Sequence, residues 1–249
     1  MANINSQNVN KAEEALRLAN KDLISFGKLF LPDDFMRSET PFFHYEVADA
    51  IDDKNIKQTA IIIPRGHGKT VLTKASIIKD FVFATKENFL FYAWVSATQK
   101  LSVGNMDYIK HHLEFNDSIK YYFGPMRGRK WTEEDIELTN GCKLISKSNV
   151  AGIRGGAKLH KRYDLIVLDD FEHEANTITK EARDKNANLV TGCVLMVLPF
   201  IMTLSLIILL TIMQSLLKIK KNFLGKLLLT KHYLTKLLHY GIHFFRYLK

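Results

Sequence analysis

A short apolar run that ends in a glycine-containing turn constrains the fold of this 249-residue chain more than any other feature. Residues 59–63 (TAIII) are apolar and β-branched, as expected for a buried parallel strand, and residues 64–70 (PRGHGKT) follow directly. A helical pattern then continues to Lys79. Glycines in such a turn let backbone N–H groups close around phosphate oxygens, and the next helix points its N-terminus at the same anion. The sequence therefore predicts a phosphate-binding loop at 64–70.

This loop departs from the common G-x-x-x-x-G-K-[ST] pattern, because Ile63 stands where the first glycine is expected. The match consists of Gly68, Lys69 and Thr70, with Gly66 inside the loop. An ordinary glycine turn with an exposed lysine is the alternative, but the strand before and the helix after favour a phosphate loop. In that case Lys69 would reach the β- and γ-phosphates and Thr70 would bind Mg²⁺.

A second apolar strand ends in carboxylates. Residues 165–168 (LIVL) are followed by Asp169 and Asp170. A carboxylate at the end of a strand beside a phosphate loop holds Mg²⁺, which prefers oxygen ligands. A further carboxylate must orient or deprotonate the attacking water, and Asp170, Glu172 and Glu174 are the candidates. A solvated acidic turn is the alternative interpretation.

Other patterns indicate an α/β fold with a largely parallel central sheet flanked by helices. Residues 10–30 repeat apolar side chains at helical spacing, and Pro32 is expected to stop that helix. Residues 89–95 form a second buried-strand candidate, and 96–114 a helix. Residues 136–145 read as a hairpin because Asn-Gly at their centre favours a type I′ turn.

Composition divides the chain into two parts. No Asp or Glu follows Asp184, and nine of the 35 Lys and Arg lie in residues 185–249, so the first 184 residues hold 26 basic against 26 acidic side chains. The whole formal charge of +9 therefore belongs to the last part. Two cysteines, Cys142 and Cys193, are too few for a disulfide scaffold or a four-cysteine zinc site. With no secretory signal pattern at the N-terminus, a reduced, cytosolic setting is expected.

Taken together, several segments resemble the ATPase part of the large terminase subunit of tailed phages, the motor that packages DNA. Residues 64–70 are similar to that family's variant phosphate loop, which has arginine and lacks the first glycine. Residues 94–99 (WVSATQ) resemble the strand and Ser-Ala-Thr turn that follow in the family. Residues 152–155 (GIRG) and 161–172 (KRYDLIVLDDFE) resemble two later motifs. The resemblance covers roughly residues 20–195 and implies a P-loop NTPase fold with ATP and Mg²⁺ as cofactors.

The resemblance also implies roles for single residues. Asp169 would join Thr70 as a Mg²⁺ ligand, and Arg65, otherwise a surface arginine, would sense the γ-phosphate. Glu172 would activate the attacking water, with Asp170 the next choice. The loop residues that would hold the nucleotide phosphates are Pro64, Gly66, His67, Gly68, Lys69 and Thr70.

Two further segments have implied roles. The pair Phe43 and His44 resembles the family's adenine-side segment. Arg154 would face nucleotide or DNA, and a loop arginine without such a role is the alternative.

The implied function is that of an ATP-hydrolysing motor subunit acting on double-stranded DNA. Portal protein and small terminase subunit would be its partners, in a homo-oligomeric ring, in the host cytoplasm at the procapsid. The expected organisation is an N-terminal helical segment at 1–40, an incomplete P-loop ATPase domain at 41–195 and an atypical tail at 196–249. The family's nuclease domain is expected to be absent, because two-metal cleavage needs carboxylates and none follows Asp184.

The tail leaves three interpretations open. A frameshift would explain why the resemblance fades near 194–199, just where the composition changes. Residues 189–213 carry no charge and are long enough to cross a bilayer, which would make the chain a membrane-tethered P-loop ATPase. A basic amphipathic tail for nucleic acid or a membrane surface is the third. A packaging motor has no need of an anchor, so a membrane is not expected; a non-functional truncated product remains a further alternative.

Overall fold

The structure is a computed structural model. It describes residues 2–55, 59–148, 150–153, 156, 158, 161–171, 179–189, 207–209 and 243–246. Its helices are α1 (Ala2–Lys21), α2 (Leu23–Phe30), α3 (Pro32–Phe35), α4 (Phe42–Asp52), α5 (Lys69–Phe83), α6 (Gln99–Phe115), α7 (Asp117–Phe123), the 3-10 turn η1 (Val150–Ile153) and α8 (Lys180–Leu189). Its strands are β1 (Thr59–Ile62), β2 (Phe91–Val95), β3 (Arg127–Trp131), β4 (Asp135–Leu138), β5 (Lys143–Lys147), β6 (Leu165–Asp169), β7 (Ile207–Leu209) and β8 (His243–Arg246).

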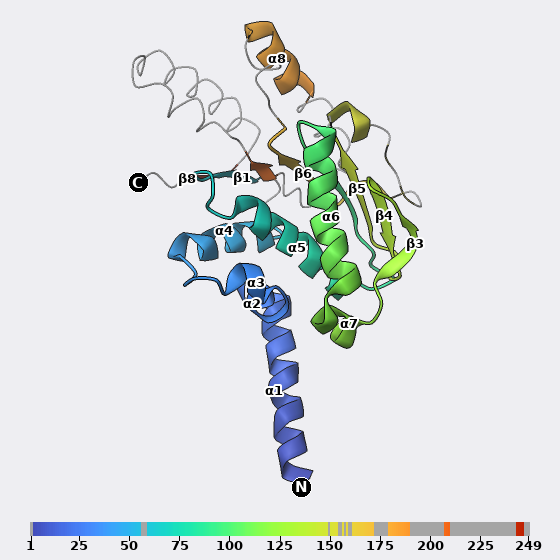
Figure 1. Ribbon diagram of the computed structural model, residues 1–249. Coiled ribbons are helices and arrows are strands. Elements are labelled where there is room, and N and C mark those ends of the chain that lie inside the picture. Colours follow the sequence, from blue (N-terminus) through green and yellow to red (C-terminus); the bar gives the residue numbers. More distant parts are fainter. Residues whose placement is uncertain are drawn as a thin grey trace.

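A mixed sheet with helices packed against it organises these elements, with strand order β3-β4-β5-β2-β6-β7-β1-β8 (Figure 1). The strands from β5 to β8 in this order pair in parallel, while β4 pairs antiparallel with both β3 and β5. The predicted α/β class is therefore confirmed, as is the hairpin between β4 and β5. The antiparallel edge is what makes the sheet mixed.

Parallel pairing decides where the chemically interesting residues lie. β1 and β6 are not direct neighbours, because β7 lies between them and pairs with both. Since all three run in the same direction, the turn after β1 and the carboxyl end of β6 fall at one edge of the sheet. The last residue of β6, Asp169, pairs with Leu209 at the end of β7.

Two strands of the sheet come from residues 196–249, the tail with the atypical composition. β7 joins β6 to β1, and β8 pairs with β1 along its whole length, from Thr59 opposite His243 to Ile62 opposite Arg246. The candidate anchor at 189–213 includes β7; apart from Leu189, the rest of it lies outside the described residues. No helix within the described residues combines the length and the apolar character that crossing a membrane requires.

The single helix predicted over 10–30 is wrong, because the chain forms two helices that meet at Asp22. This residue is extended (φ −129°, ψ 126°), and its carboxylate accepts hydrogen bonds from the N–H groups of Ile24 (3.3 Å) and Ser25 (2.6 Å). An aspartate in this position supplies acceptors for backbone donors that the first turn of a helix leaves unpaired. Pro32 likewise begins α3, where its missing N–H costs no hydrogen bond.

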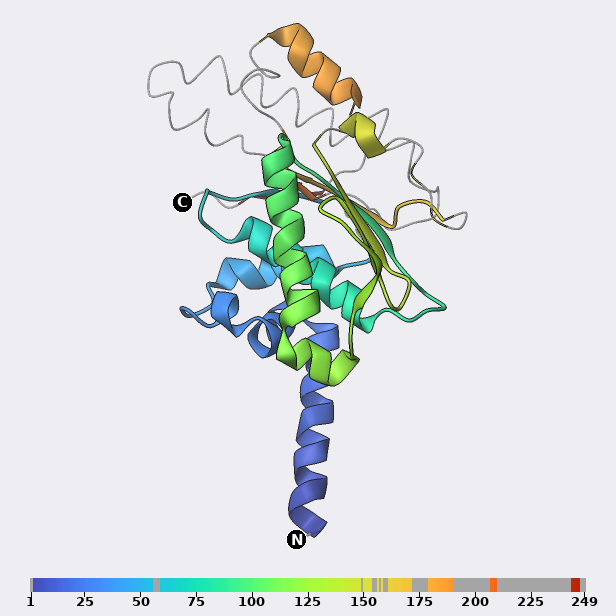
Figure 2. The same cartoon turned by 45° about the vertical axis from the view of Figure 1, so that its right-hand side comes forward.

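The hydrophobic core joins the sheet to one layer of helices. α5 packs against α2, α4 and α6, and α6 packs against β5, as Figure 2 shows with α6 lying across the strands. Trp94 of β2 and Phe26 and Phe30 of α2 are among the largest fully buried side chains. α1 projects from the end of the molecule opposite α8 (Figure 1). The N-terminal helices α2 and α4 thus belong to the same core as the sheet and α5.

Removing the cap at Asp22 tests this break between helices. We expect Asp22→Ala to lower the free energy of unfolding by about 1 kcal/mol, because the N–H groups at the start of α2 lose their acceptors. Urea unfolding monitored by circular dichroism measures it. Asp49→Ala, an exposed position within α4, is the control and should change stability by less than about 0.5 kcal/mol. An equal effect of the two substitutions would contradict the capping role.

Candidate functional site

The predicted loop lies between β1 and α5, and its backbone needs glycine at two positions. Gly66 and Gly68 have φ of 77° and 78°, in the left-handed region that other residues rarely adopt. Gly68 is also the N-cap of α5, and its carbonyl accepts the N–H of Leu72 at 2.9 Å. A side chain at Gly68 would also press on His44, whose Nε2 lies 3.2 Å from the position of a β-carbon.

The structure brings the loop and the second motif together. Thr70, in the first turn of α5, donates a hydrogen bond from Oγ1 to Oδ1 of Asp169 at 3.3 Å, although 99 residues separate them in sequence. The Asp169 side chain is buried, with 4% of the residue exposed. A hydroxyl and a carboxylate therefore lie side by side where β6 ends and the helix after the loop begins.

Charge in this region is partly compensated. The pKa of Asp169 is raised to about 6, chiefly by burial and then by the neighbouring Asp170, while the Thr70 hydrogen bond and two lysines, Lys74 and Lys69, act in the opposite direction. Burial lowers the pKa of Lys69, against the pull of Asp170 and Asp169. Exposed Arg65 adds its positive charge to this group and lowers the Lys69 pKa. A divalent cation would stabilise the ionised form of Asp169, which burial disfavours.

Asp170 turns the chain sharply at the end of β6. Its φ is 45°, and it is the single residue other than glycine with a positive φ among those that the structure describes. Its carbonyl accepts the N–H of Ala97 at 3.0 Å, which joins the ends of β6 and β2. Aspartate tolerates this conformation better than most residues do.

The predicted site residues therefore divide into two groups. Those found together at one edge of the sheet are Pro64, Arg65, Gly66, His67, Gly68, Lys69, Thr70, Asp169 and Asp170. Three others, Arg154, Glu172 and Glu174, lie outside the described residues. Glu172 as the residue that activates water stays a prediction.

Sequence reasoning missed Lys74, which lies one helical turn after Thr70. Its ammonium stands 4.5 Å from the centre of the Tyr108 ring on α6, and burial lowers its pKa while Asp169 and Asp34 raise it. The Tyr108 hydroxyl in turn donates to Oδ2 of Asp34 on α3 at 2.5 Å. The spacing of four residues from Thr70 was the available signal, because positions i and i+4 share one face of a helix.

A second missed group supports Asp169 from α6. The amide nitrogen of Asn105 lies 3.5 Å from Asp169 Oδ2 and 3.4 Å from the hydroxyl of Ser96. That hydroxyl also accepts a hydrogen bond from Trp94 Nε1 at 3.1 Å. No sequence signal pointed to Asn105, because only the packing of α6 against the sheet brings it within reach of Asp169.

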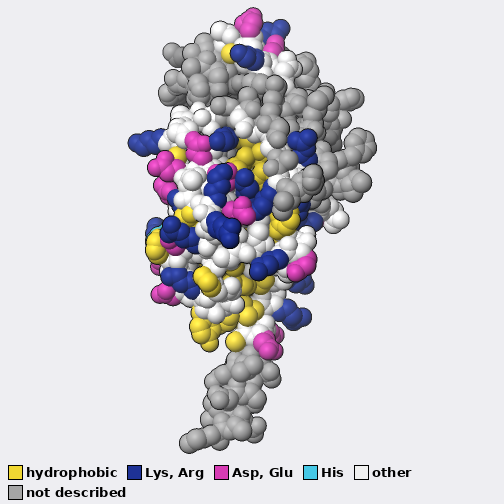
Figure 3. All heavy atoms as spheres, turned by 90° about the vertical axis from the view of Figure 1, so that its right-hand side faces the viewer, with side chains coloured by type: hydrophobic (Ala, Val, Ile, Leu, Met, Phe, Trp, Pro, Cys, Tyr) yellow, Lys and Arg dark blue, Asp and Glu magenta, His cyan; other side chains and the backbone are white. Residues whose placement is uncertain are grey.

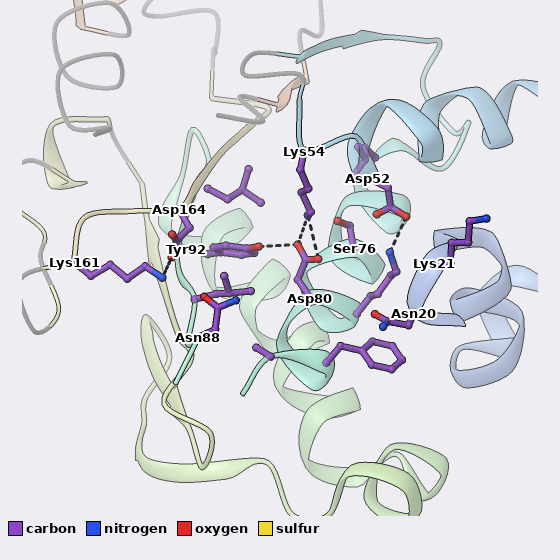
Figure 4. Close-up of a pocket in the computed structure, with 16 residues that line it drawn as sticks. Asn20, Lys21, Asp52, Lys54, Ser76, Asp80, Asn88, Tyr92, Lys161 and Asp164 are labelled. Atoms are coloured by element: carbon purple, nitrogen blue, oxygen red, sulfur yellow. Dashed lines mark hydrogen bonds and ion pairs between the residues drawn. The ribbon is translucent and has the colours of Figure 1, made fainter. Parts of the chain in front are cut away.

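A cavity of about 500 Å³ lies at the opposite edge of the sheet, where β2 and β6 begin (Figure 4). Apart from Lys21, its charged side chains form the ion pairs that the dashed lines mark. The ion pairs are Lys79 with Asp52 (2.8 Å), Lys54 with Asp80 (3.2 Å) and Lys161 with Asp164 (3.0 Å). These pairs stabilise the packing of α4, α5 and the start of β6, and the cavity is separate from the loop after β1.

No family model matches the chain, and no curated protein matches it. Within the described ranges, no three His, Cys, Asp or Glu side chains gather into a metal-binding group. Among the described residues, the glycine loop and the Thr70–Asp169 pair are the structural observations that bear on function.

The raised pKa of Asp169 predicts a pH-dependent effect on stability. An acid whose pKa is higher in the folded chain stabilises the fold below its ordinary value of 3.8, and that contribution is lost as pH rises through about 6. We expect the free energy of unfolding of Asp169→Asn to equal that of the parent near pH 4 and to exceed it by on the order of 2 kcal/mol at about pH 7.5.

Urea unfolding of parent and variant across this range, in buffer without divalent cations, measures the difference. Asp107→Asn, at a side chain that is 58% exposed, is the control and should show no such divergence. If the free energies of unfolding of parent and Asp169→Asn differed by the same amount at every pH, the burial of an ionisable carboxyl would be contradicted.

Proposed function

We propose that this chain is a Mg²⁺-dependent ATPase of the P-loop kind, and that it serves as the motor subunit of a phage DNA-packaging terminase. The observation that carries the ATPase proposal is the hydrogen bond between Thr70 and Asp169. It joins the first turn of a helix that follows a glycine loop to a carboxylate at the end of β6, a parallel strand of the same sheet.

The position in the sheet supports the proposal. Ligands of open α/β sheets bind outside the carboxyl ends of the strands. The turn after β1 and the end of β6 lie at that edge, and α5 points its N-terminus there with Lys69 in its first position. Phosphates are stabilised at such a helix end by free N–H groups and by the helix dipole.

The donor set fits Mg²⁺. Two neighbouring ligands of an octahedral Mg²⁺, each at about 2.1 Å, lie about 3 Å apart. Thr70 Oγ1 and Asp169 Oδ1 are 3.3 Å apart, and both are oxygen donors of the kind that this ion prefers. When bound, Mg²⁺ would neutralise charge on the β- and γ-phosphates.

The chain's own residues would divide the remaining work. Lys69 would hold the β- and γ-phosphates, and exposed Arg65 would contact the γ-phosphate, where charge develops during transfer. Glu172, three positions after Asp169, would accept the proton of the attacking water or orient it, with Asp170 as the next choice.

The DNA-packaging part of the proposal depends on the resemblance of residues 20–195 to terminases. Double-stranded DNA, portal protein, small terminase subunit, a homo-oligomeric ring and the host cytoplasm are proposed on that ground. Figure 3 shows basic and acidic side chains intermixed over the coloured part of one face, which therefore presents no uniformly basic surface there. Lys130 and Lys143 share the carboxylate of Asp135, and Lys147 pairs with Glu134, so acidic neighbours offset most of the positive charge of these lysines.

Nucleotide binding should depend on Lys69. We expect Lys69→Ala to abolish hydrolysis and to weaken Mg·ATP binding more than tenfold, or about 1.4 kcal/mol, because the ammonium replaces water around phosphate oxygens. Calorimetry measures the affinity. Lys86→Ala, an exposed lysine in the turn that follows α5, is the control and should bind like the parent. Equal affinity of Lys69→Ala and the parent would exclude the loop as the phosphate site.

Glu172 should matter for hydrolysis more than for binding. We expect Glu172→Gln to retain ATP affinity and to lower the hydrolysis rate about 10²-fold or more, because glutamine keeps the shape and removes the base. Steady-state phosphate release and equilibrium binding separate the two effects. If Asp170→Asn produces this result and Glu172→Gln does not, Asp170 is the residue that activates water.

A further inference from the structure

Two histidines hold carbonyl groups of the loop between β1 and α5. Nε2 of His44, on α4, lies 2.8 Å from the carbonyl oxygen of His67, and Nδ1 of His67 lies 2.9 Å from the carbonyl oxygen of Arg65. A carbonyl oxygen can only accept a hydrogen bond, so each of these ring nitrogens must be the donor. The contacts therefore assign the hydrogen to Nε2 in His44 and to Nδ1 in His67.

These hydrogen bonds fix the direction in which the loop's N–H groups point. All peptide bonds of the described chain are trans, and in a planar trans peptide the carbonyl and the next N–H point to opposite sides. Carbonyls of Arg65 and His67 that face the imidazoles thus turn the N–H groups of Gly66 and Gly68 away from them. Neither N–H donates to another group among the residues that the structure describes.

The packing around the two imidazoles keeps them in place. The Phe43 ring lies 4.6 Å from the His44 ring and 5.8 Å from the His67 ring, measured between ring centres. Gly68 lies close to this group as well, because a β-carbon added to it would be 3.2 Å from His44 Nε2. α4 thereby contacts the loop through a hydrogen bond and through ring packing.

We propose that His44 is a positioning residue, which presets the loop so that the N–H groups of Gly66 and Gly68 are ready to bind phosphate. This inference rests on the proposed nucleotide-binding function. It differs from the adenine-side role that the resemblance implied for Phe43 and His44, because it acts on the phosphate chain through the loop backbone. A loop held in its binding conformation loses less conformational entropy when the ligand binds.

The test uses the full chain and two ligands, Mg·ATP and Mg·tripolyphosphate, which has a phosphate chain but no base. His44→Phe keeps a ring and removes the donor, whereas His44→Gln retains an amide N–H at a comparable distance from the backbone. We expect His44→Phe to lower the affinity for both ligands by a similar factor, about five- to tenfold, in line with the loss of one hydrogen bond. His44→Gln should recover most of that affinity.

The matched control is Tyr45→Phe on the same helix, which removes only an exposed hydrogen bond to Lys28 (3.3 Å) and should bind both ligands like the parent. Thermal melting establishes that each variant is folded. If His44→Phe does not fold, the same test is made on the second hydrogen bond, at the exposed loop residue His67. His67→Leu should lower the affinity for both ligands. His67→Asn, whose amide N–H replaces Nδ1–H, should recover that affinity.

Three outcomes would overturn the inference. Unchanged tripolyphosphate binding together with weaker ATP binding would put His44 at the base. Equal affinity of parent and His44→Phe for both ligands would show that the His44 hydrogen bond does not preset the loop. A His44→Gln variant that is folded yet binds no better than His44→Phe would exclude the hydrogen bond as the cause. A parent chain that binds neither ligand would instead overturn the proposed function, and this inference with it.

Discussion

The hydrogen bond between Thr70 and Asp169 depends on the parallel pairing of β6, β7 and β1, which places two distant motifs at one edge of the sheet. This arrangement buries the Asp169 carboxylate beside a second one, Asp170, and burial raises the pKa of Asp169 accordingly. Lys69 and Lys74 on α5 offset part of the cost of that burial. A site in which charge is only partly compensated is suited to a cation and an anion that arrive together, such as Mg²⁺ with a polyphosphate.

The N-terminal helices contribute to this site as well as to the core. α4 supplies His44, which holds a loop carbonyl, and α3 supplies Asp34, which accepts the hydroxyl hydrogen of Tyr108. The Tyr108 ring lies under the ammonium of Lys74. α4 thus contacts the loop directly, whereas α6 contacts Lys74 of α5 through Tyr108 and α3 holds the Tyr108 hydroxyl.

Local sequence patterns predicted individual strands and turns reliably. The apolar runs predicted β1, β2 and β6 to within one or two residues, because a strand buried on both faces consists almost entirely of apolar residues. Asn140 and Gly141 marked the turn between β4 and β5, where Gly141 has φ of 88°. The break at Asp22 was missed because the apolar repeat continues through it, and only the extended backbone reveals that its carboxylate caps a new helix. Contacts of Lys74 and Asn105 with the site depend on how α5 and α6 pack.

The sequence by itself determined the pieces of the candidate site: a glycine loop between a strand and a helix, and carboxylates at the end of another strand. Glycine and proline limit backbone angles locally, and runs of apolar residues demand burial, so neighbours in sequence are enough to predict these pieces. The tertiary structure alone decided that β7, from the atypical tail, lies between β6 and β1, and that His44 meets the loop. These contacts join residues far apart in the chain, and their geometry depends on the packing of the whole sheet.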